Sequence, residues 1–309
     1  MSILDHRELV FVTGKGGVGK TTVAIAVALA AARGGRRVVL AEVGGQARAA
    51  SLFDVSDADL PGRETPLDRG VWVTTVDPLR ALEEWATRVV GSRRLVGVLA
   101  RSNAFAAFVH AAPGARELIT ITKAWELGRQ ARWDRRRHGY DLVVVDGPAS
   151  GHGLGMLSTP RAFAEIARVG PIASQAREVD ELLRDPSRSA ILTVALPAEL
   201  PVSETLDLEG RVRDALRRDV DAIVVNGVLP RRFSGEDVAH VAAADGAAPS
   251  AVLAAVRSHH GQSAAQQAQL RRLRAGAGAA VHTLPLRPVT RLGRDDVAEL
   301  ADVLERRLR

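Results

Sequence analysis

The chain has 309 residues, of which 46% are hydrophobic, and this is enough apolar content for one large α/β domain or two smaller ones. It contains no cysteine, which excludes disulfides, thiolate zinc sites, iron–sulfur clusters and cysteine nucleophiles. The formal charge of +6 comes mostly from arginines that are spread over many expected helix faces beside acidic residues. Aromatic residues make up only 4%, so few platforms for stacked bases exist and the composition does not favour nucleic-acid binding.

The sequence carries no sign of export or membrane insertion. Residues 1–14 lack a basic start followed by an apolar stretch and a cleavage site, and no run of eighteen apolar residues follows. We therefore expect a cytoplasmic protein without an integral membrane segment.

The first expected strand is the apolar run 9–12, and a glycine-rich loop follows it directly. Residues 14–22 read GKGGVGKTT, which fits the phosphate-binding pattern G-x-x-x-x-G-K-[ST] between a strand and a helix. Glycines allow backbone N–H groups to converge on phosphate oxygens at a helix N-terminus, where peptide dipoles favour negative charge. We expect Lys20 to reach the β- and γ-phosphates and Thr21 to offer its hydroxyl to Mg²⁺. The expected nucleotide-binding residues of the loop are Gly14, Gly16, Gly17, Val18, Gly19, Lys20, Thr21 and Thr22.

Further short apolar runs alternate with helical stretches along the chain. They span residues 37–42, 71–76, 141–146, 190–196, 222–226 and 281–284. Their nearly continuous hydrophobicity indicates strands buried on both faces, and the alternation with helices predicts a doubly wound, mostly parallel sheet of the α/β class. Ligands bind beyond the carboxyl ends of such strands, where the glycine-rich loop lies.

Two stretches interrupt this rhythm. Residues 78–138 and about 158–188 carry helical patterns without a convincing strand. We expect a single P-loop ATPase domain over residues 1–309, with an α-helical subdomain inserted at these two places. Residues 295–309 predict a terminal amphipathic helix.

An aspartate ends the expected strand at 141–146. A carboxylate at a strand end that faces a phosphate loop can hold Mg²⁺ directly or through water. A lone aspartate in such a place is often only a helix N-cap, and it is the pairing with the glycine-rich loop that indicates a metal-binding role. Thr21 and Asp146 are therefore the expected Mg²⁺ residues.

The lysine directly after the first glycine adds a second signal to the loop. Lys15 and Lys20 are two of only three lysines in the chain, and KGGVGKTT resembles the deviant Walker A loop of a group of dimeric ATPases. The resemblance implies that Lys15 crosses a dimer interface to the partner's nucleotide, which makes it a catalytic residue together with Lys20. It also implies that nucleotide state is coupled to dimerisation, as a homodimer or as a heterodimer with a paralogue.

Downstream segments narrow the resemblance to the family of arsenite-pump ATPases and tail-anchored-protein targeting ATPases. Residues 146–160, DGPASGHGLGMLSTP, are similar to the second switch of that family, and residues 196–205, LPAELPVSET, are similar to its P-E-x-L-P-x-x-E-T segment. The resemblance implies that Asn226 reads the adenine of ATP and that Pro285 belongs to the adenine-side loop. The residues alone leave an alternative role open, because asparagine is also common in the turn at the end of a strand.

Two features depart from that family. Its first switch carries an aspartate that acts on the attacking water, but the matching position here is Gly44. Glu42 is the nearest catalytic carboxylate to replace it, and Gln46 can orient a water without acting as a base. The cysteine pair that shares a zinc ion across the targeting-ATPase dimer is absent. The missing aspartate affects the expected rate of hydrolysis, and the missing cysteine pair affects how a dimer is held together. Neither affects the expected binding of ATP.

The expected helical insert is unusually apolar for a surface subdomain. Its hydrophobic residues are Val89, Val90, Leu95, Val96, Val98, Leu99, Phe105, Phe108 and Val109, with a second stripe of Phe163, Ile166, Val169 and Ile172. They either line a groove for a hydrophobic transmembrane segment, as the resemblance implies, or pack the core of the subdomain itself.

We expect a dimeric ATPase that binds and hydrolyses ATP with Mg²⁺ and couples nucleotide state to the handling of a hydrophobic, membrane-protein-like client. The alternative is a nucleotide-binding scaffold or regulatory subunit with little turnover, paired with an active paralogue. A third interpretation is a surface-binding switch similar to the ParA and MinD proteins.

Overall fold

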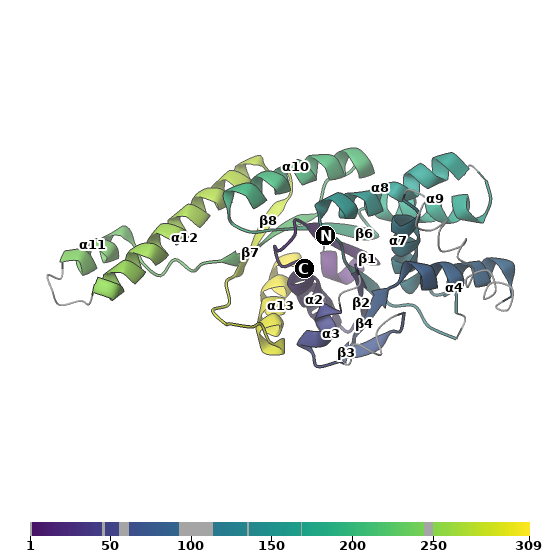
Figure 1. Cartoon of the computed structure of the whole chain (residues 1–309), viewed down its shortest axis with the longest axis horizontal. Coiled ribbons are helices and arrows are strands. Elements are labelled where there is room, and N and C mark those ends of the chain that lie inside the picture. Colours follow the sequence, from purple (N-terminus) through teal and green to yellow (C-terminus); the bar gives the residue numbers. More distant parts are fainter. Residues whose placement is uncertain are drawn as a thin grey trace.

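The computed structural model describes residues 2–44, 47–55, 62–92, 114–134, 136–167, 169–243 and 250–309. Gln46 lies outside the described residues, and so does the apolar group from Leu95 to Val109. Figure 1 shows a central sheet with helices on both faces, a long helical arm on one side and a group of helices on the other.

The sheet has eight strands in the order β3-β4-β2-β5-β1-β6-β7-β8. The strands are β1 (Leu9–Gly14), β2 (Val38–Val43), β3 (Thr65–Asp68), β4 (Val71–Val76), β5 (Leu142–Asp146), β6 (Ser189–Ala195), β7 (Ala222–Val228) and β8 (Ala280–Pro285). All neighbouring strands are parallel except β3, which pairs antiparallel with β4. This arrangement confirms the prediction of a mostly parallel α/β sheet, with β3 as one additional edge strand.

The helices connect successive strands and cover both faces of the sheet (Figure 1). They are α1 (Ile3–His6), α2 (Lys20–Arg33), α3 (Arg48–Leu52), α4 (Pro78–Val90), α7 (Ala115–Leu127), α8 (Ser150–Ala167), α9 (Pro171–Arg184), α10 (Glu199–Leu216), α11 (Gly235–Ala243), α12 (Ser250–Gly276) and α13 (Arg294–Leu308). The last of these is the predicted terminal amphipathic helix, which buries one stripe that includes Leu300 and Leu304.

Alternate residues of the central strands face two separate cores, because side chains alternate across a strand. Leu40 and Val144 belong to the core beneath α2 and α13. Val39 and Val143 belong to the core beneath α7, α8, α9, α10 and α12. Both faces of the sheet are therefore covered, as the continuous apolar runs predict.

Helix α2 is held in the centre of the first core. All residues from 23 to 31 are buried, and the alanine-rich sequence allows the helix to pack closely on the sheet while α13 covers its outer side. The N-terminus of this helix directly follows the glycine-rich loop, so the loop is attached to one of the most deeply packed elements of the molecule.

Helices α4, α7, α8 and α9 pack against one another beyond the sheet (Figure 1). They occupy parts of residues 78–138 and 158–188, and no strand occurs there among the described residues. The division into one ATPase domain with an inserted helical subdomain stays a prediction. Within the described ranges, no helix combines the length and the hydrophobicity needed to traverse a bilayer.

Candidate functional site

The glycine-rich loop links the end of β1 to the start of α2, and two of its glycines have conformations that other residues rarely adopt. Gly14 has a φ of 144°, and a Cβ there would lie 2.3 Å from the carbonyl oxygen of Val194. Gly19 has a φ of 90°, and a Cβ there would lie 2.2 Å from Nδ2 of Asn226. Both positions require glycine, so the turn that aims backbone N–H groups outward depends on the sequence pattern.

Lys20 and Thr21 open α2 at the centre of this loop. Nζ of Lys20 donates a hydrogen bond to the carbonyl oxygen of Lys15 at 2.9 Å, so the ammonium group lies within the curve of the loop. Burial lowers the pKa of Lys20, while the negative charge of Asp146 opposes that shift. The hydroxyl of Thr21 donates to Oδ2 of Asp146 at 2.6 Å, which ties the start of α2 to the end of β5.

Glu42 lies one residue before the end of β2, in register with Asp146 at the end of the parallel neighbour β5. Each stands two residues after a residue of the first core, so both side chains project from the face that α2 covers. Glu42 is 1% exposed and Asp146 is 8% exposed. Two carboxylates are thus buried side by side next to Lys20 and Thr21.

Burial perturbs both carboxyl groups. It raises the pKa of Glu42 to about 7, although the hydrogen bond from the Ala49 amide opposes the shift. It also raises the pKa of Asp146, and there the hydrogen bond from Thr21 opposes the shift. Carboxyl groups with a shifted pKa beside a phosphate-binding loop are candidates for a functional site.

The segment that follows β2 contains Gly44 at the position where the sequence resemblance expects an aspartate. Gly44 is exposed with a φ of 105°, and no atom lies within 4 Å of the position a Cβ would take. Oε1 of Glu42 accepts a hydrogen bond from the Ala49 amide at 3.0 Å, which fixes the start of α3. Arg48, the first residue of α3, is a charged neighbour of Lys20, Glu42 and Asp146. Sequence reasoning missed this arginine, because only the fold brings the start of α3 back to the loop.

Lys15 does not point into the loop in this chain. Its ammonium group forms an ion pair with Oε1 of Glu204, which lies on α10 in the segment similar to P-E-x-L-P-x-x-E-T. The side chain of Lys15 remains 50% exposed. A Cβ added at Gly16 or Gly17 would meet no other atom within 4 Å, whereas Val18 is buried.

The residues expected near adenine lie on β7 and β8. Nδ2 of Asn226 donates to the carbonyl oxygen of Val18 at 3.1 Å, so the structure brings this residue to the glycine-rich loop. Pro285 ends β8 and pairs with Val228 of β7, two residues beyond Asn226. Thr22 is half-buried in the first turn of α2. The predicted nucleotide residues therefore occupy the carboxyl ends of β1, β7 and β8 and the start of α2.

Thr21 and Asp146 supply the hard oxygen donors that Mg²⁺ prefers, and Oδ1 of Asp146 is a buried atom without a hydrogen-bond partner among the described residues. The fit to a magnesium ion held by a nucleotide is good, since Mg²⁺ usually takes one or two protein groups together with phosphates and water. The site is therefore suited to a triphosphate and its metal.

Comparisons with known proteins agree on one group. Residues 7–169 match a protein-family model described as anion-transporting ATPase. The ATPase BagA of Mycobacterium tuberculosis is 33% identical over 247 residues, which cover 78% of this chain and 71% of the relative. The arsenical pump-driving ATPase of Escherichia coli is 25% identical over 247 residues, or 74% of this chain and 41% of the relative. An ATPase ASNA1 homolog of Entamoeba dispar is 24% identical over 259 residues, or 72% of this chain and 76% of the relative.

Proposed function

The chain belongs to the anion-transporting ATPase family, and on that premise we propose that it is a cytoplasmic dimer that binds and hydrolyses ATP with Mg²⁺ and couples nucleotide state to a hydrophobic client. The family match confirms the resemblance inferred from the loop and from the downstream segments. The hydrogen bond between Thr21 and Asp146 is the observation that carries the proposal, because it joins the two expected metal-binding residues directly beneath the phosphate loop.

Each residue of the site has a proposed part in nucleotide binding. The amides of the glycine-rich loop and the start of α2 bind the phosphates, and Lys20 neutralises the β- and γ-phosphates. Asn226 selects adenine through its carboxamide, which both donates and accepts, and Pro285 borders the base. Magnesium bound to the nucleotide would neutralise charge on the transferred phosphoryl group, with Thr21 and Asp146 as its protein partners.

Hydrolysis is proposed in spite of the altered segment after β2. Gly44 stands in place of the usual aspartate of the first switch. Glu42 is the carboxylate nearest to it along the chain, and we propose that Glu42 contributes to turnover. The glycine at position 44 itself supports a second candidate function, in which the chain binds ATP with little turnover and acts as a scaffold beside an active paralogue.

Calorimetry and turnover measurements with Lys20→Ala test the nucleotide proposal. We expect wild-type protein to bind Mg·ATP and the variant to lose about 10²–10³-fold in turnover, as for removal of one group that stabilises transition-state charge. Arg33→Ala, at the opposite end of α2, is the matched control and should behave as wild type. Absence of any heat on titration with Mg·ATP contradicts the proposal, whereas binding with equal turnover in wild type and Lys20→Ala supports the scaffold.

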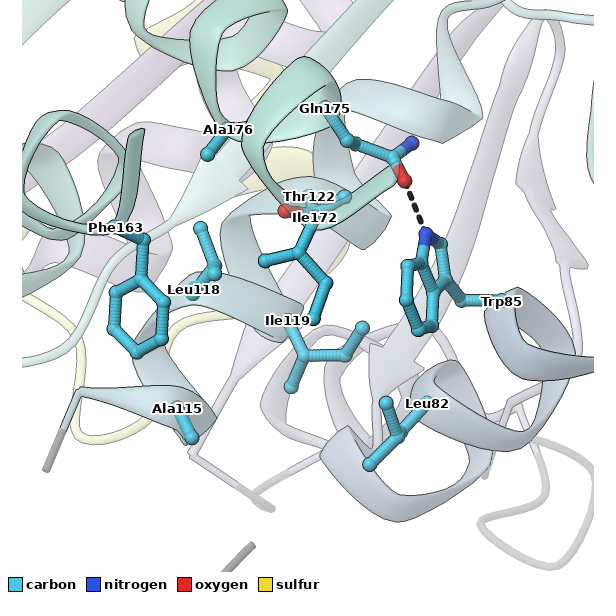
Figure 2. A pocket seen from close by; sticks show the side chains of 10 residues that line it. All are labelled: Leu82, Trp85, Ala115, Leu118, Ile119, Thr122, Phe163, Ile172, Gln175 and Ala176. Atoms are coloured by element: carbon cyan, nitrogen blue, oxygen red, sulfur yellow. Dashed lines mark hydrogen bonds between the residues drawn. The ribbon is translucent and has the colours of Figure 1, made fainter. Parts of the chain in front are cut away.

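The client proposal is supported by an apolar cavity of about 130 Å³ between α4, α7, α8 and α9 (Figure 2). Its lining consists of Leu82, Trp85, Ala115, Leu118, Ile119, Thr122, Phe163, Ile172, Gln175 and Ala176. Trp85 Nε1 donates to Oε1 of Gln175, so these two polar atoms of the lining are paired with each other. An apolar cavity of about 150 Å³ can stay dry and take up a benzene-sized group, so this one is suited to an apolar side chain of a client.

An exposed apolar surface borders the cavity. Ile166 lies one helical turn after Phe163 on α8, and it is 78% exposed. Val169 is 82% exposed, and Ile172 both lines the cavity and reaches the surface. Exposed apolar side chains within a few residues of the cavity-lining Phe163 and Ile172 favour docking of a hydrophobic helix over service as the core of the subdomain.

Binding of a fluorescent apolar helical peptide, with and without nucleotide, tests the client proposal. Ile166→Asp should abolish peptide binding without loss of stability, because the residue is exposed. Val252→Asp replaces an exposed valine on α12, far along the chain from the cavity, and should retain binding. Equal binding by both variants and wild type would contradict a client site here, and so would equal loss in both.

A further inference from the structure

Two buried carboxylate oxygens on the strands β2 and β5 have no hydrogen-bond partner among the described residues. They are Oε2 of Glu42 and Oδ1 of Asp146. A buried ionised oxygen without a partner costs several kcal/mol, so such atoms are rare in a native structure and call for a ligand.

Each carboxylate is fixed through its other oxygen. Oε1 of Glu42 accepts from the amide of Ala49, and Oδ2 of Asp146 accepts from the hydroxyl of Thr21. The residues are in register on neighbouring parallel strands and project from one face of the sheet. The two unpartnered oxygens therefore belong to one polar space at the start of α2, and neither side chain can turn away without breaking an existing hydrogen bond.

The cations already near this space do not supply the missing hydrogen bonds. Lys20 donates to the loop carbonyl of Lys15 rather than to either carboxylate. Arg48 is exposed at the start of α3; its charge acts on both carboxylates, and its backbone amide, not its guanidinium group, interacts with Glu42. Two negative groups close together instead suit a divalent cation with its bound waters.

We propose that Glu42 is a second carboxylate of the magnesium site, and that it holds the metal of bound Mg·ATP through metal-bound water from the end of β2. The inference rests on the proposed function, since the ion arrives with the nucleotide. Among the described residues no group of three or more His, Asp or Glu side chains is arranged to hold a metal ion, so phosphates and water complete the shell. Glu42 is thus a positioning residue whose first effect is on metal affinity.

The structure separates this role from that of a general base. One oxygen of Glu42 accepts a hydrogen bond from the Ala49 amide in the first turn of α3, so the carboxylate is fixed to the scaffold. A base acts on the proton of the attacking water and leaves metal affinity unchanged. A metal-positioning carboxylate changes metal affinity even when no reaction takes place.

The test titrates Mg²⁺, or Mn²⁺ followed by electron paramagnetic resonance, into protein that is saturated with a non-hydrolysable ATP analogue. Glu42→Gln keeps the shape and the acceptor for the Ala49 amide but removes the charge. We expect it to weaken metal affinity about 10–100-fold, the range found for groups that support metal-bound ligands, with analogue affinity in chelator unchanged or tighter. Glu8→Gln removes one negative charge before the start of β1, where the exposed Glu8 pairs with Arg188, and should leave metal affinity as in wild type.

Circular dichroism establishes that each variant is folded, and Glu42→Asp gives a second route if Glu42→Gln is not. The aspartate keeps the charge but withdraws it by one methylene, so metal affinity should again fall. Unchanged metal affinity in a folded Glu42 variant overturns the inference, even if turnover falls. A wild-type protein that binds no analogue with or without metal overturns the proposed function itself, and the two failures are therefore distinguishable.

Discussion

Two pairs of carboxylate side chains differ in whether their oxygens have hydrogen-bond partners. Glu42 and Asp146 at the nucleotide site each keep an oxygen without a hydrogen-bond partner. Glu64, directly before β3, and Glu126, on α7, have a hydrogen-bond partner at every carboxylate oxygen. Arg132 bridges them with hydrogen bonds of 2.7 Å to each, and Tyr140 donates to Glu64 at 3.0 Å.

The difference teaches that burial alone does not mark a functional carboxylate. Burial would raise the pKa of Glu64, but hydrogen bonds and charge from Arg132 and Arg137 outweigh it and lower the pKa to about 2. At Glu42 no cation is hydrogen-bonded, and the pKa rises to about 7. The paired group stabilises the fold, whereas the unpaired group stays available for a ligand.

The largest expected effect is that of removing the arginine between the paired carboxylates. Arg132→Met leaves Glu64 and Glu126 buried without their shared cation and should lower the free energy of unfolding by about 3–5 kcal/mol. Urea denaturation measures this change. Arg161→Met removes an exposed arginine paired with Glu165 and should cost less than about 1 kcal/mol. Equal effects of the two substitutions would contradict the structural role of the buried network.

A pH series sharpens the same comparison. The pKa of Glu64 is lowered from 4.5 to about 2, so its contribution is fully present above pH 4.5 and is lost as pH falls toward 2. That shift corresponds to about 3 kcal/mol. Urea midpoints of wild type and Glu64→Gln should therefore differ most near neutral pH and converge in acid. Glu8→Gln, at an exposed ion pair with Arg188, should show little change with pH. A constant gap between wild type and Glu64→Gln would refute the assignment.

Within the nucleotide site, the loop glycines should differ from each other. Gly14→Ala places a Cβ 2.3 Å from a backbone carbonyl at a φ of 144°, and we expect a loss of about 1–3 kcal/mol in unfolding free energy together with weaker ATP binding. Gly16→Ala is the matched control, because nothing lies within 4 Å of its Cβ position. Thermal unfolding of the two variants distinguishes them, and similar stability of both would show that the loop is not constrained at its first glycine.

The smallest expected effect is at the ion pair of Lys15 and Glu204. Both groups are partly exposed, so Glu204→Gln should change the unfolding free energy by less than about 1 kcal/mol. It should also release Lys15 and strengthen ATP-dependent self-association by a few-fold, as measured by sedimentation with the non-hydrolysable analogue. Weaker association in the variant would show that Glu204 supports the dimer instead of competing with it.

The sequence predicts the parallel strands because each can be recognised from its own apolar run, without knowledge of the strand that it pairs with. It does not predict β3, because this four-residue edge strand contains Pro66 and pairs antiparallel through a register shift. The glycine-rich loop is equally predictable, since its conformation is dictated by local residue types. The roles assigned to Glu42, Asn226 and Pro285 stay predictions.

Long-range pairing is what sequence reasoning could not supply. The arginines at 135–137 read as one basic cluster, yet Arg137 pairs with Glu64, which lies more than seventy positions away in the chain. Arg48 and Glu204 reach the loop only through the fold; residues 196–205 resemble a family segment, but that resemblance does not show that Glu204 pairs with Lys15. The stripe on α8 and α9 was visible as an apolar pattern, but its exposure depends on how these helices pack.

Helix α8 has a mechanical consequence. Its 18 residues begin four positions after Asp146 and give it a length of about 27 Å, with Ile166 in the last turn. A tilt of about 10° around the first turn therefore sweeps the far end through about 5 Å, a distance comparable with one turn of helix. Pro160 removes one backbone hydrogen bond along the way and gives this lever a bending point. A slight rearrangement around Asp146 would thereby be amplified at the far end of α8, where Phe163 lines the apolar cavity.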